Sequence, residues 1–290
     1  MNTYQITVIY ASHNKGSIAT FPPQTIPASR LQVISVYEED NFHPRKRSLA
    51  AIEKALGTYT ILLDEQDQFP EDFLSRLAAH LDHTDTAFVI PSQHYKTAVN
   101  FPDQTATLTL FPMTADSNVD ICQTTIMPPV ELAGILFRTE IIQQLLPECL
   151  SLEEPEKLLL LKLLDRYPVF PFLASATLQY SWPRETDLLY DPRSYSKEWY
   201  MVPLQSFLLP LLKSVAEKSR DIPSPLQNLA LIMVLCRLFP NLNNRDKGLF
   251  TKEEIFPDYM QLLTRILSYV DEEIIIHSPL LSSGHVLTLK

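Results

Sequence analysis

Residues 58–74 read TYTILLDEQDQFPEDFL, and they predict a buried strand, an acidic turn and a helix in that order. The first six residues are apolar or β-favouring and include no Gly or Pro, as expected of a central strand in a covered sheet. Pro70 suits the first turn of a helix, where its missing N–H costs nothing. The helix then shows apolar residues at helical spacing, namely Phe73, Leu74, Leu77 and Leu81.

The acidic turn places two carboxylates, Asp64 and Asp67, at the carboxyl end of the predicted strand. In open α/β sheets, ligands bind at this edge. Two carboxylates there can hold a hard divalent cation, which in turn holds a diphosphate. The alternative is that the acidic side chains only cap the passage from strand to helix. The local sequence leaves both interpretations open.

The composition excludes several classes of protein. The chain has 290 residues, a net charge of −10 and a pI near 5.2, whereas nucleic-acid binders normally carry a basic footprint. Hydrophobic residues make up 46%, which is ample for a packed core. With only five glycines, the chain has no Gly-rich phosphate loop of the G-x-G-x-x-G or Walker A type.

The cysteines and the N-terminus bear on the compartment. Cys122, Cys149 and Cys236 are far apart and odd in number, so we expect reduced, buried thiols and no disulfide framework. The first residues lack the basic region and apolar core of a signal peptide. No apolar run reaches the ~18 residues needed to span a bilayer. We therefore expect a cytoplasmic protein.

Strand and helix patterns divide the chain into two parts. Up to residue 190, predicted strands alternate with predicted helices, which indicates an α/β domain. These elements include a helix over 48–56 and two closing strands over 169–173 and 177–184. From Asp191 onward, helix patterns replace strand patterns. We expect helices over 195–218, kinked at Pro210, over 223–238 and over 256–270. The predicted domains are thus 1–190, a mixed sheet flanked by helices, and 191–290, a helical extension.

Several motifs resemble those of the family-2 inverting glycosyltransferases of GT-A fold. Residues 62–67, LLDEQD, are similar to the family's apolar strand followed by its Asp-x-Asp-Asp cluster. Residues 55–59, ALGTY, resemble the Ala-x-Gly-x-Tyr step before it. Residues 128–141 resemble a small-residue strand followed by a Phe-Arg-x-Glu helix start. Residues 155–164, PEKLLLLKLL, resemble the family's Glu-Asp-Leu-Leu-Phe-Leu-Leu-Lys-Leu-Leu helix.

The resemblance implies a GT-A-like fold, a nucleotide-sugar donor and a set of site residues. Aligning Lys162 puts Glu156 at the family's catalytic base, an aspartate. The resemblance also implies a Mg²⁺ or Mn²⁺ ion held by Asp64 and Asp67. The resemblance implies that the nucleotide-sugar contacts Ala11, Asn14, Glu38, Arg47 and Asp64. Asn14 keeps the residue of the family's Pro-x-Tyr-Asn turn, whereas Ala11 replaces its proline. Glu38 matches a family aspartate in register, and Arg47 lies one residue from the family's arginine.

The helical part resembles the extension of family-2 enzymes that are joined to glycerol-phosphate polymer transferases in Gram-positive wall-polymer and capsule systems. Residues 199–200, 225–227 and 269–275 carry this likeness. It implies a glycan or polyol-phosphate acceptor in a cell-wall, capsule or protein-linked glycan. It also implies a transferase partner, C-terminal or separate, and a location at the inner face of the membrane. The expected partners include no nucleic acid.

Departures from the family pattern support a second hypothesis, a catalytically degenerate module that binds an acceptor or a partner protein. Gln66 replaces the family's second aspartate, Ser48 replaces an arginine and Pro155 replaces a glutamate. The prolines between residues 15 and 29 also disfavour the family's first helix. A hydrolase or dehydrogenase is disfavoured, because the chain has no G-x-S-x-G motif and its histidines form no metal-ligand spacing.

Overall fold

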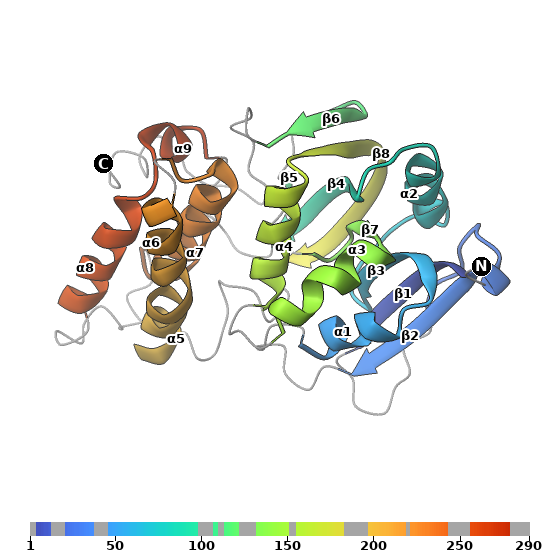
Figure 1. Cartoon of the computed structure of the whole chain (residues 1–290), viewed down its shortest axis with the longest axis horizontal. Helices are drawn as coiled ribbons and strands as arrows, with labels where there is room; N and C mark the ends of the chain where they lie inside the picture. The colour runs from blue at the N-terminus through green and yellow to red at the C-terminus, as the bar shows by residue number, and fades with distance from the viewer. Residues whose placement is uncertain are drawn as a thin grey trace. The chain divides into compact units, whose positions relative to one another are not determined.

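The structure, a computed structural model, describes residues 4–12, 21–37, 46–97, 107–109, 113–121, 132–150, 155–182, 197–218, 221–242 and 256–278. The chain divides into two compact units (Figure 1). The first comprises Met1–Asp120 and Pro129–Arg184, and the second comprises Ile121–Pro128 and Glu185–Lys290. The sequence predicted the change of character at residue 191, within a stretch that lies outside the described residues.

The first unit is built on a mixed β-sheet. Its strands follow the order β2-β1-β3-β7-β4-β8-β6, and β5 pairs with β4. β1 is parallel to β2 and β3, whereas β7 is antiparallel to its neighbours β3 and β4. The strands are β1 (Tyr4–Ser12), β2 (Leu31–Tyr37), β3 (Gly57–Asp64), β4 (Phe88–Thr97), β5 (Thr107–Thr109), β6 (Ser117–Asp120), β7 (Leu136–Arg138) and β8 (Val169–Trp182).

Helices cover both faces of this sheet. Successive side chains of β3 point to opposite faces. Thr60 exchanges a hydrogen bond of 2.8 Å with Thr139, the first residue of α3 (Thr139–Leu145), whereas Tyr59 donates one of 2.7 Å to Asp82, the last residue of α2 (Phe73–Asp82). The two helices therefore lie on opposite faces. The remaining helices of this unit are η1 (Ala28–Arg30), α1 (Lys46–Ala51), η2 (Ile52–Lys54), η3 (Leu146–Glu148) and α4 (Pro155–Arg166).

β3 is the central strand that the opening stretch predicts. From Tyr59 to Asp64 every residue is buried. Its first residue, Gly57, lies so close to β1 that an added Cβ would stand 2.5 Å from the backbone nitrogen of Thr7. The Gly57 N–H also donates to the Thr7 hydroxyl at 2.8 Å. The α/β class and the mixed sheet flanked by helices are thus confirmed.

The second unit is helical in its described residues. It comprises α5 (Lys197–Val202), the π-helix η4 (Pro203–Leu208), α6 (Leu209–Lys218), α7 (Ser224–Leu242), α8 (Phe256–Leu267) and α9 (Glu272–Ile276). Two motifs of the family likeness meet here, because the amide of Gln227 donates to Asp271 at 2.8 Å and accepts the Asp271 N–H at 2.6 Å. Gln227 therefore fixes the start of α9 against α7.

Several elements differ from the sequence expectations. The predicted helix 195–218 is divided by the π-helix η4, which begins at Pro203, and Pro210 lies near the start of α6; each proline removes a backbone donor. The predicted strands 169–173 and 177–184 form one strand, β8, whose pairing with β4 shifts register between Pro91 and Ser92. The expected helix 48–56 ends as the short 3-10 turn η2.

Candidate active site

The acidic turn, residues 64–67, closes on itself at the carboxyl end of β3. The Asp67 carboxylate accepts the Asp64 N–H at 2.8 Å, and the Asp64 carboxylate accepts the Gln66 N–H at 3.1 Å. Asp64 is 1% exposed and Asp67 is 8% exposed. Glu65 accepts a hydrogen bond of 2.8 Å from the Ser12 hydroxyl at the end of β1. The backbone thus fixes the orientation of both aspartates.

The predicted nucleotide-sugar residues that the structure describes gather at this edge. Ala11 of β1 pairs directly with Asp64 of β3. Arg47, on the exposed side of α1, donates to the carbonyl oxygen of Tyr37 at 3.0 Å, where β2 ends beside β1. Ala11 and Asp64 therefore lie at the carboxyl ends of β1 and β3, and the guanidinium of Arg47, from α1, contacts the carboxyl end of β2. Asn14 and Glu38 lie outside the described residues.

A row of three aromatic side chains lies next to the acidic turn. The ring of Tyr10 packs edge-on against Phe21, with the centroids 5.3 Å apart, and Phe21 faces Phe69 at 6.0 Å. Burial raises the pKa of Tyr10, and the negative charges of Asp64 and its neighbours in the turn raise it further. The Tyr10 hydroxyl therefore stays protonated beside the carboxylates.

A buried segment, Leu132–Gly134, brings Glu156 to the same edge. The Glu156 carboxylate, in the first turn of α4, accepts the Leu132 N–H at 2.9 Å. The Gly134 N–H donates to the carbonyl oxygen of Leu62 in β3 at 2.8 Å, two residues before Asp64. Gly134 has a φ of 76°, a conformation that favours glycine. We call Leu132–Gly134 the bridging segment, because it links α4 to the end of β3.

The donor set of the acidic turn fits a hard divalent cation that is shared with a ligand. Carboxylate oxygens are the ligands that Mg²⁺ and Mn²⁺ prefer. Within the described ranges, no three His, Cys, Asp or Glu side chains are grouped to hold a metal ion. The pair Asp64 and Asp67 is sufficient for Mg²⁺, because proteins usually bind this ion through one or two carboxylates. Water and substrate phosphates complete its coordination shell.

Three contributors to this edge had little or no signal in the sequence. Ser12 orients Glu65, and Gln68 exchanges two backbone hydrogen bonds with Gln179 of β8, at 2.9 and 2.8 Å, which anchors the end of the turn. Gln93 donates to the carbonyl oxygen of Ala133 in the bridging segment at 3.4 Å. The only sequence feature of Gln93 is that a polar residue continues an apolar strand, which by itself does not indicate a function.

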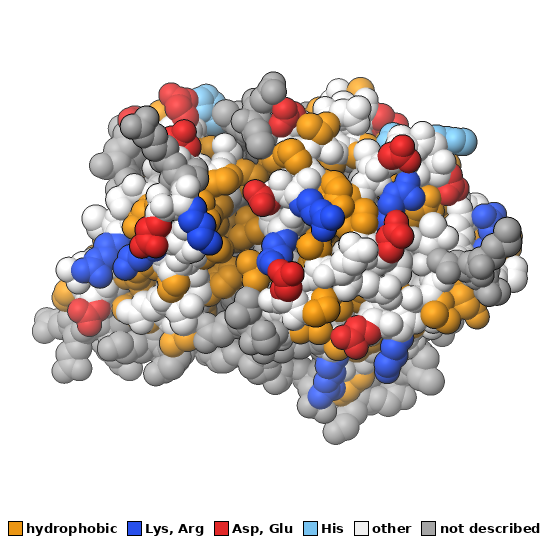
Figure 2. All heavy atoms as spheres, viewed as in Figure 1, with side chains coloured by type: hydrophobic (Ala, Val, Ile, Leu, Met, Phe, Trp, Pro, Cys, Tyr) orange, Lys and Arg blue, Asp and Glu red, His pale blue; other side chains and the backbone are white. Residues whose placement is uncertain are grey.

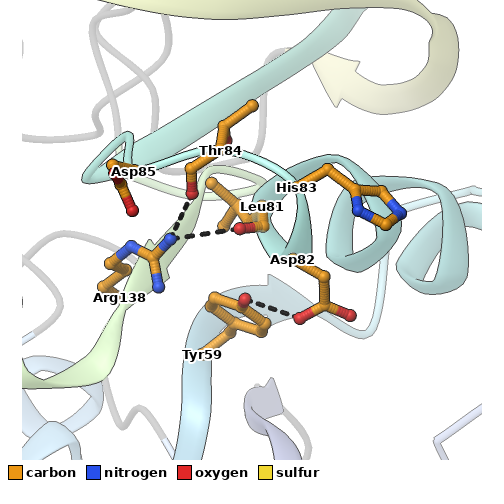
Figure 3. A pocket seen from close by; sticks show the side chains of 7 residues that line it. All are labelled: Tyr59, Leu81, Asp82, His83, Thr84, Asp85 and Arg138. Carbon is orange, nitrogen blue, oxygen red and sulfur yellow. Dashed lines mark hydrogen bonds between the residues drawn. The ribbon is translucent and has the colours of Figure 1, made fainter.

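The opposite end of β3 carries a polar cavity of about 400 Å³ (Figure 3). Burial and the hydrogen bond to Asp82 raise the pKa of Tyr59 to about 12. Arg138 holds the end of α2 and the chain after it by donating to the carbonyl oxygens of Leu81, Thr84 and Thr86. The lining comprises Tyr59, Leu81, Asp82, His83, Thr84, Asp85 and Arg138. Its central polar groups are thus engaged with the chain itself.

The described surface offers two further observations. On the face shown in Figure 2, the Lys and Arg side chains that are described lie among Asp and Glu side chains and gather in no basic patch. No helix among the described residues is long and apolar enough to cross a membrane.

Comparison with known proteins gives a family model that matches part of the chain and solved structures that share the fold. Residues 25–146 match the family model of glycosyl transferase family 2. TarS of S. aureus, residues 1–349 in complex with UDP-GlcNAc, matches with a TM-score of 0.60 and 16% identity, over 94% of this chain and 83% of that chain. The complex of the same region with UDP gives 0.60 and 15%, over 98% and 86%.

The structure of S. aureus TarS without that truncation gives a TM-score of 0.56 at 15% identity, over 99% of this chain and 53% of that one. This chain therefore spans about half of that TarS structure. At such identities the likeness shows a shared fold. No curated protein matches the chain.

Proposed function

The chain carries a glycosyl transferase family 2 domain, and on this premise we propose that it transfers a sugar from a nucleotide-diphosphate donor to a hydroxyl group, with inversion. The observation that supports this most is that Asp64 and Glu156 reach one edge of the sheet from different elements. In such sites the diphosphate and the acceptor bind on opposite sides of the sugar. Two separately held carboxylates suit these two tasks.

The donor side comprises the carboxyl ends of β1, β2 and β3. We assign nucleotide-sugar contacts to Ala11, Asn14, Glu38, Arg47 and Asp64. The guanidinium of Arg47, from α1, donates to the carbonyl oxygen of Tyr37, the last residue of β2, which supports its assignment to this edge. UDP is the first nucleotide to test, because it occupies a TarS structure of the same fold.

Asp64 and Asp67 would hold the divalent cation, Mg²⁺ or Mn²⁺. When bound, the cation would neutralise negative charge on the departing diphosphate. The chain's own contribution is to hold both carboxylates in fixed orientations through the Asp64 and Gln66 N–H groups. Preorganised groups of this kind need no reorganisation during the reaction.

Glu156 acts as the general base. One of its oxygens is anchored by the Leu132 N–H, so the carboxylate is oriented before the acceptor arrives. The carboxylate takes the proton of the acceptor hydroxyl while that oxygen bonds to the anomeric carbon. The bond from this carbon to the diphosphate oxygen breaks, and the diphosphate leaves with the electron pair. General-base catalysis of this type contributes about 10²–10⁴-fold.

The proposed acceptor and partner rest on the family likeness of the helical part. We propose a glycan or polyol-phosphate acceptor of a cell-wall or capsule polymer, a GT-A-like domain over 1–190 and a helical extension over 191–290. The extension would serve a transferase partner, C-terminal or separate, at the inner face of the membrane. The contact between Gln227 and Asp271 supports treating the two matching motifs as one structural feature.

Thermal unfolding with UDP and Mg²⁺, followed by turnover of UDP-sugars, tests the function. A bound nucleotide raises the unfolding temperature by mass action, and we expect the increase to require the metal. Asp64→Asn keeps the oxygen that accepts the Gln66 N–H but removes the charge, so it should weaken metal-dependent binding at least about 100-fold. Asp82→Asn, at the other end of the sheet, is the matched control and should leave binding unchanged.

The second candidate is a module that binds an acceptor or partner without transfer. Gln66 at the family's second aspartate position favours it. In that case Mg²⁺ and UDP would leave the unfolding temperature unchanged. Alternatively, they would raise it, but the protein would release no UDP from any UDP-sugar.

A further inference from the structure

Gln93 holds a buried polar atom that the chain does not satisfy. The side chain is 1% exposed, and its amide nitrogen donates to the Ala133 carbonyl oxygen at 3.4 Å. Its amide oxygen, Oε1, has no hydrogen-bond partner among the described residues. Rotating the amide by 180° would set two acceptors against each other, so the Ala133 carbonyl fixes which atom is the oxygen.

The sheet register places Gln93 beside the candidate active site. Thr60 of β3 and Phe88 of β4 both pair with Phe137 of β7. Asp64 and Ser92 each stand four residues further along these strands, so Gln93 is one position beyond the level of Asp64. The two strands flank β7, which puts them roughly 10 Å apart. The bridging segment precedes β7 and occupies the space between them.

Gln93 therefore contacts the bridging segment between the two predicted functional groups. Its partner Ala133 follows Leu132, whose N–H is bound by Glu156. Ala133 also precedes Gly134, which is bound to Leu62 near Asp64. In the proposed reaction, the diphosphate lies near Asp64 and the acceptor near Glu156. The group between them is the transferred sugar.

An unsatisfied buried acceptor destabilises the folded state, so its retention needs a reason. The buried Gln227 shows the ordinary arrangement, because its nitrogen and its oxygen both have partners. At 3.4 Å the bond of Gln93 to Ala133 is at the long limit, so the amide can turn slightly without losing a strong interaction.

We propose that Gln93 is a specificity-determining residue for the transferred sugar. Its amide nitrogen sets the Ala133 carbonyl at the sheet edge, and its amide oxygen accepts a hydrogen bond from a hydroxyl or N–H group of the donor sugar. The inference rests on the proposed function, and it adds the residue that distinguishes the sugar from the nucleotide.

Calorimetric titration of Gln93→Met tests this, because methionine has a similar shape and no amide. The chain with Mg²⁺ is titrated with UDP and with UDP-GlcNAc, UDP-glucose and UDP-galactose, and the sugar with the largest gain over UDP is chosen. The variant should bind UDP with an affinity within about twofold of that of the original chain. The ratio of its affinity for the UDP-sugar to its affinity for UDP should fall about tenfold. Its unfolding temperature should not fall, since an unsatisfied acceptor is removed.

Gln143→Met is the matched control. The Gln143 amide donates to the carbonyl oxygens of Ile52 and Ala55, near the opposite end of β3. This variant should lower the unfolding temperature and leave the gain from the sugar unchanged. Gln93→Leu replaces Gln93→Met if the latter does not fold, and retained UDP binding reports folding in either case.

The outcomes separate the two proposals. If the original chain binds no UDP with Mg²⁺, the proposed function fails, and the inference fails with it. If UDP binds but no sugar adds affinity, or if Gln93→Met keeps the full gain from the sugar, the inference alone is overturned. A fall in unfolding temperature as large as that of Gln143→Met would also overturn it.

Discussion

At the amino end of β3, Tyr59 donates to Asp82 and Arg138 donates to three backbone carbonyls, so polar side chains serve to hold α2 and the chain after it. At the carboxyl end of the same strand, the polar groups are also buried and ordered, but Gln93 keeps an oxygen without a partner there. Gly134 adopts a left-handed conformation at this end as well. The unsatisfied oxygen of Gln93 reduces stability, and the amino end shows no such buried atom among its described residues.

This difference separates a structural cavity from a candidate active site. The amino-end cavity has a lining that includes two carboxylates, an arginine and a histidine (Figure 3). A search for charged residues around a hollow would select it. Hydrogen-bond satisfaction points to the other end, because natural proteins keep unsatisfied or strained groups mainly where function requires them.

The largest expected effect is on turnover, from Glu156→Gln. Glutamine keeps an oxygen for the Leu132 N–H, so the bridging segment should stay in place. Removing the base should lower kcat about 10²–10⁴-fold and leave metal-dependent UDP binding nearly intact. Steady-state release of UDP, measured beside calorimetric binding, checks both quantities.

Glu148→Gln is the control for that variant. Glu148 is mostly exposed and forms an ion pair with Lys162, which lowers the pKa of the Glu148 carboxyl group. Exposed pairs contribute little, so its kcat should be unchanged. Equal kcat for Glu156→Gln and the original chain would remove Glu156 as the base and favour the binding module.

The next effect compares two glycines. In Gly57→Ala the new Cβ would stand 2.5 Å from the Thr7 backbone nitrogen, and overpacking of this kind costs about 1–3 kcal/mol of unfolding free energy. UDP binding by the folded protein should be unchanged. Gly134→Ala forces alanine to a φ of 76°, at about 1–2 kcal/mol, and should also lower kcat because the bridging segment shifts. Urea unfolding and turnover of both variants test this contrast, which disappears if both lose kcat equally.

The smallest effect concerns Tyr59→Phe. Loss of the hydrogen bond to Asp82 should cost about 1 kcal/mol at pH 7. The pKa of Tyr59 is raised from 10 to about 12, so the folded state binds the proton more tightly than the unfolded state. The stabilisation that protonated Tyr59 gives the folded state is complete below pH 10 and is lost as the pH rises through about 12. Urea unfolding should therefore show the gap between variant and original chain narrowing over this range, and a constant gap would contradict the assignment.

The sequence supported the prediction of one half of the candidate site. Residues 58–63 form a strand because β-favouring residues fill a buried position, and the position of Asp64 and Asp67 at its carboxyl end follows from that. The motif around Gly134 could also be recognised in the sequence, because its glycine and small neighbours are typical of a tightly packed backbone.

The other half depends on contacts between residues distant in the sequence. Gln93 approaches Ala133 only because β7 lies between β3 and β4, and strand order is not written in local periodicity. The single strand β8 was predicted as two strands, and the residues between them fall where the pairing with β4 shifts register. The π-helix η4 begins at Pro203, whereas the sequence pattern predicted the interruption at Pro210.

A crystal structure with Mn²⁺ and UDP tests the central claim most directly, namely that the carboxyl edge of the sheet is the ligand site. We predict an anomalous manganese peak within about 2.0–2.6 Å of an oxygen of Asp64 or Asp67, with the UDP diphosphate on the same ion. A manganese or UDP position in the cavity between Tyr59 and Asp85, with the acidic turn unchanged and free of ligand, would contradict the account.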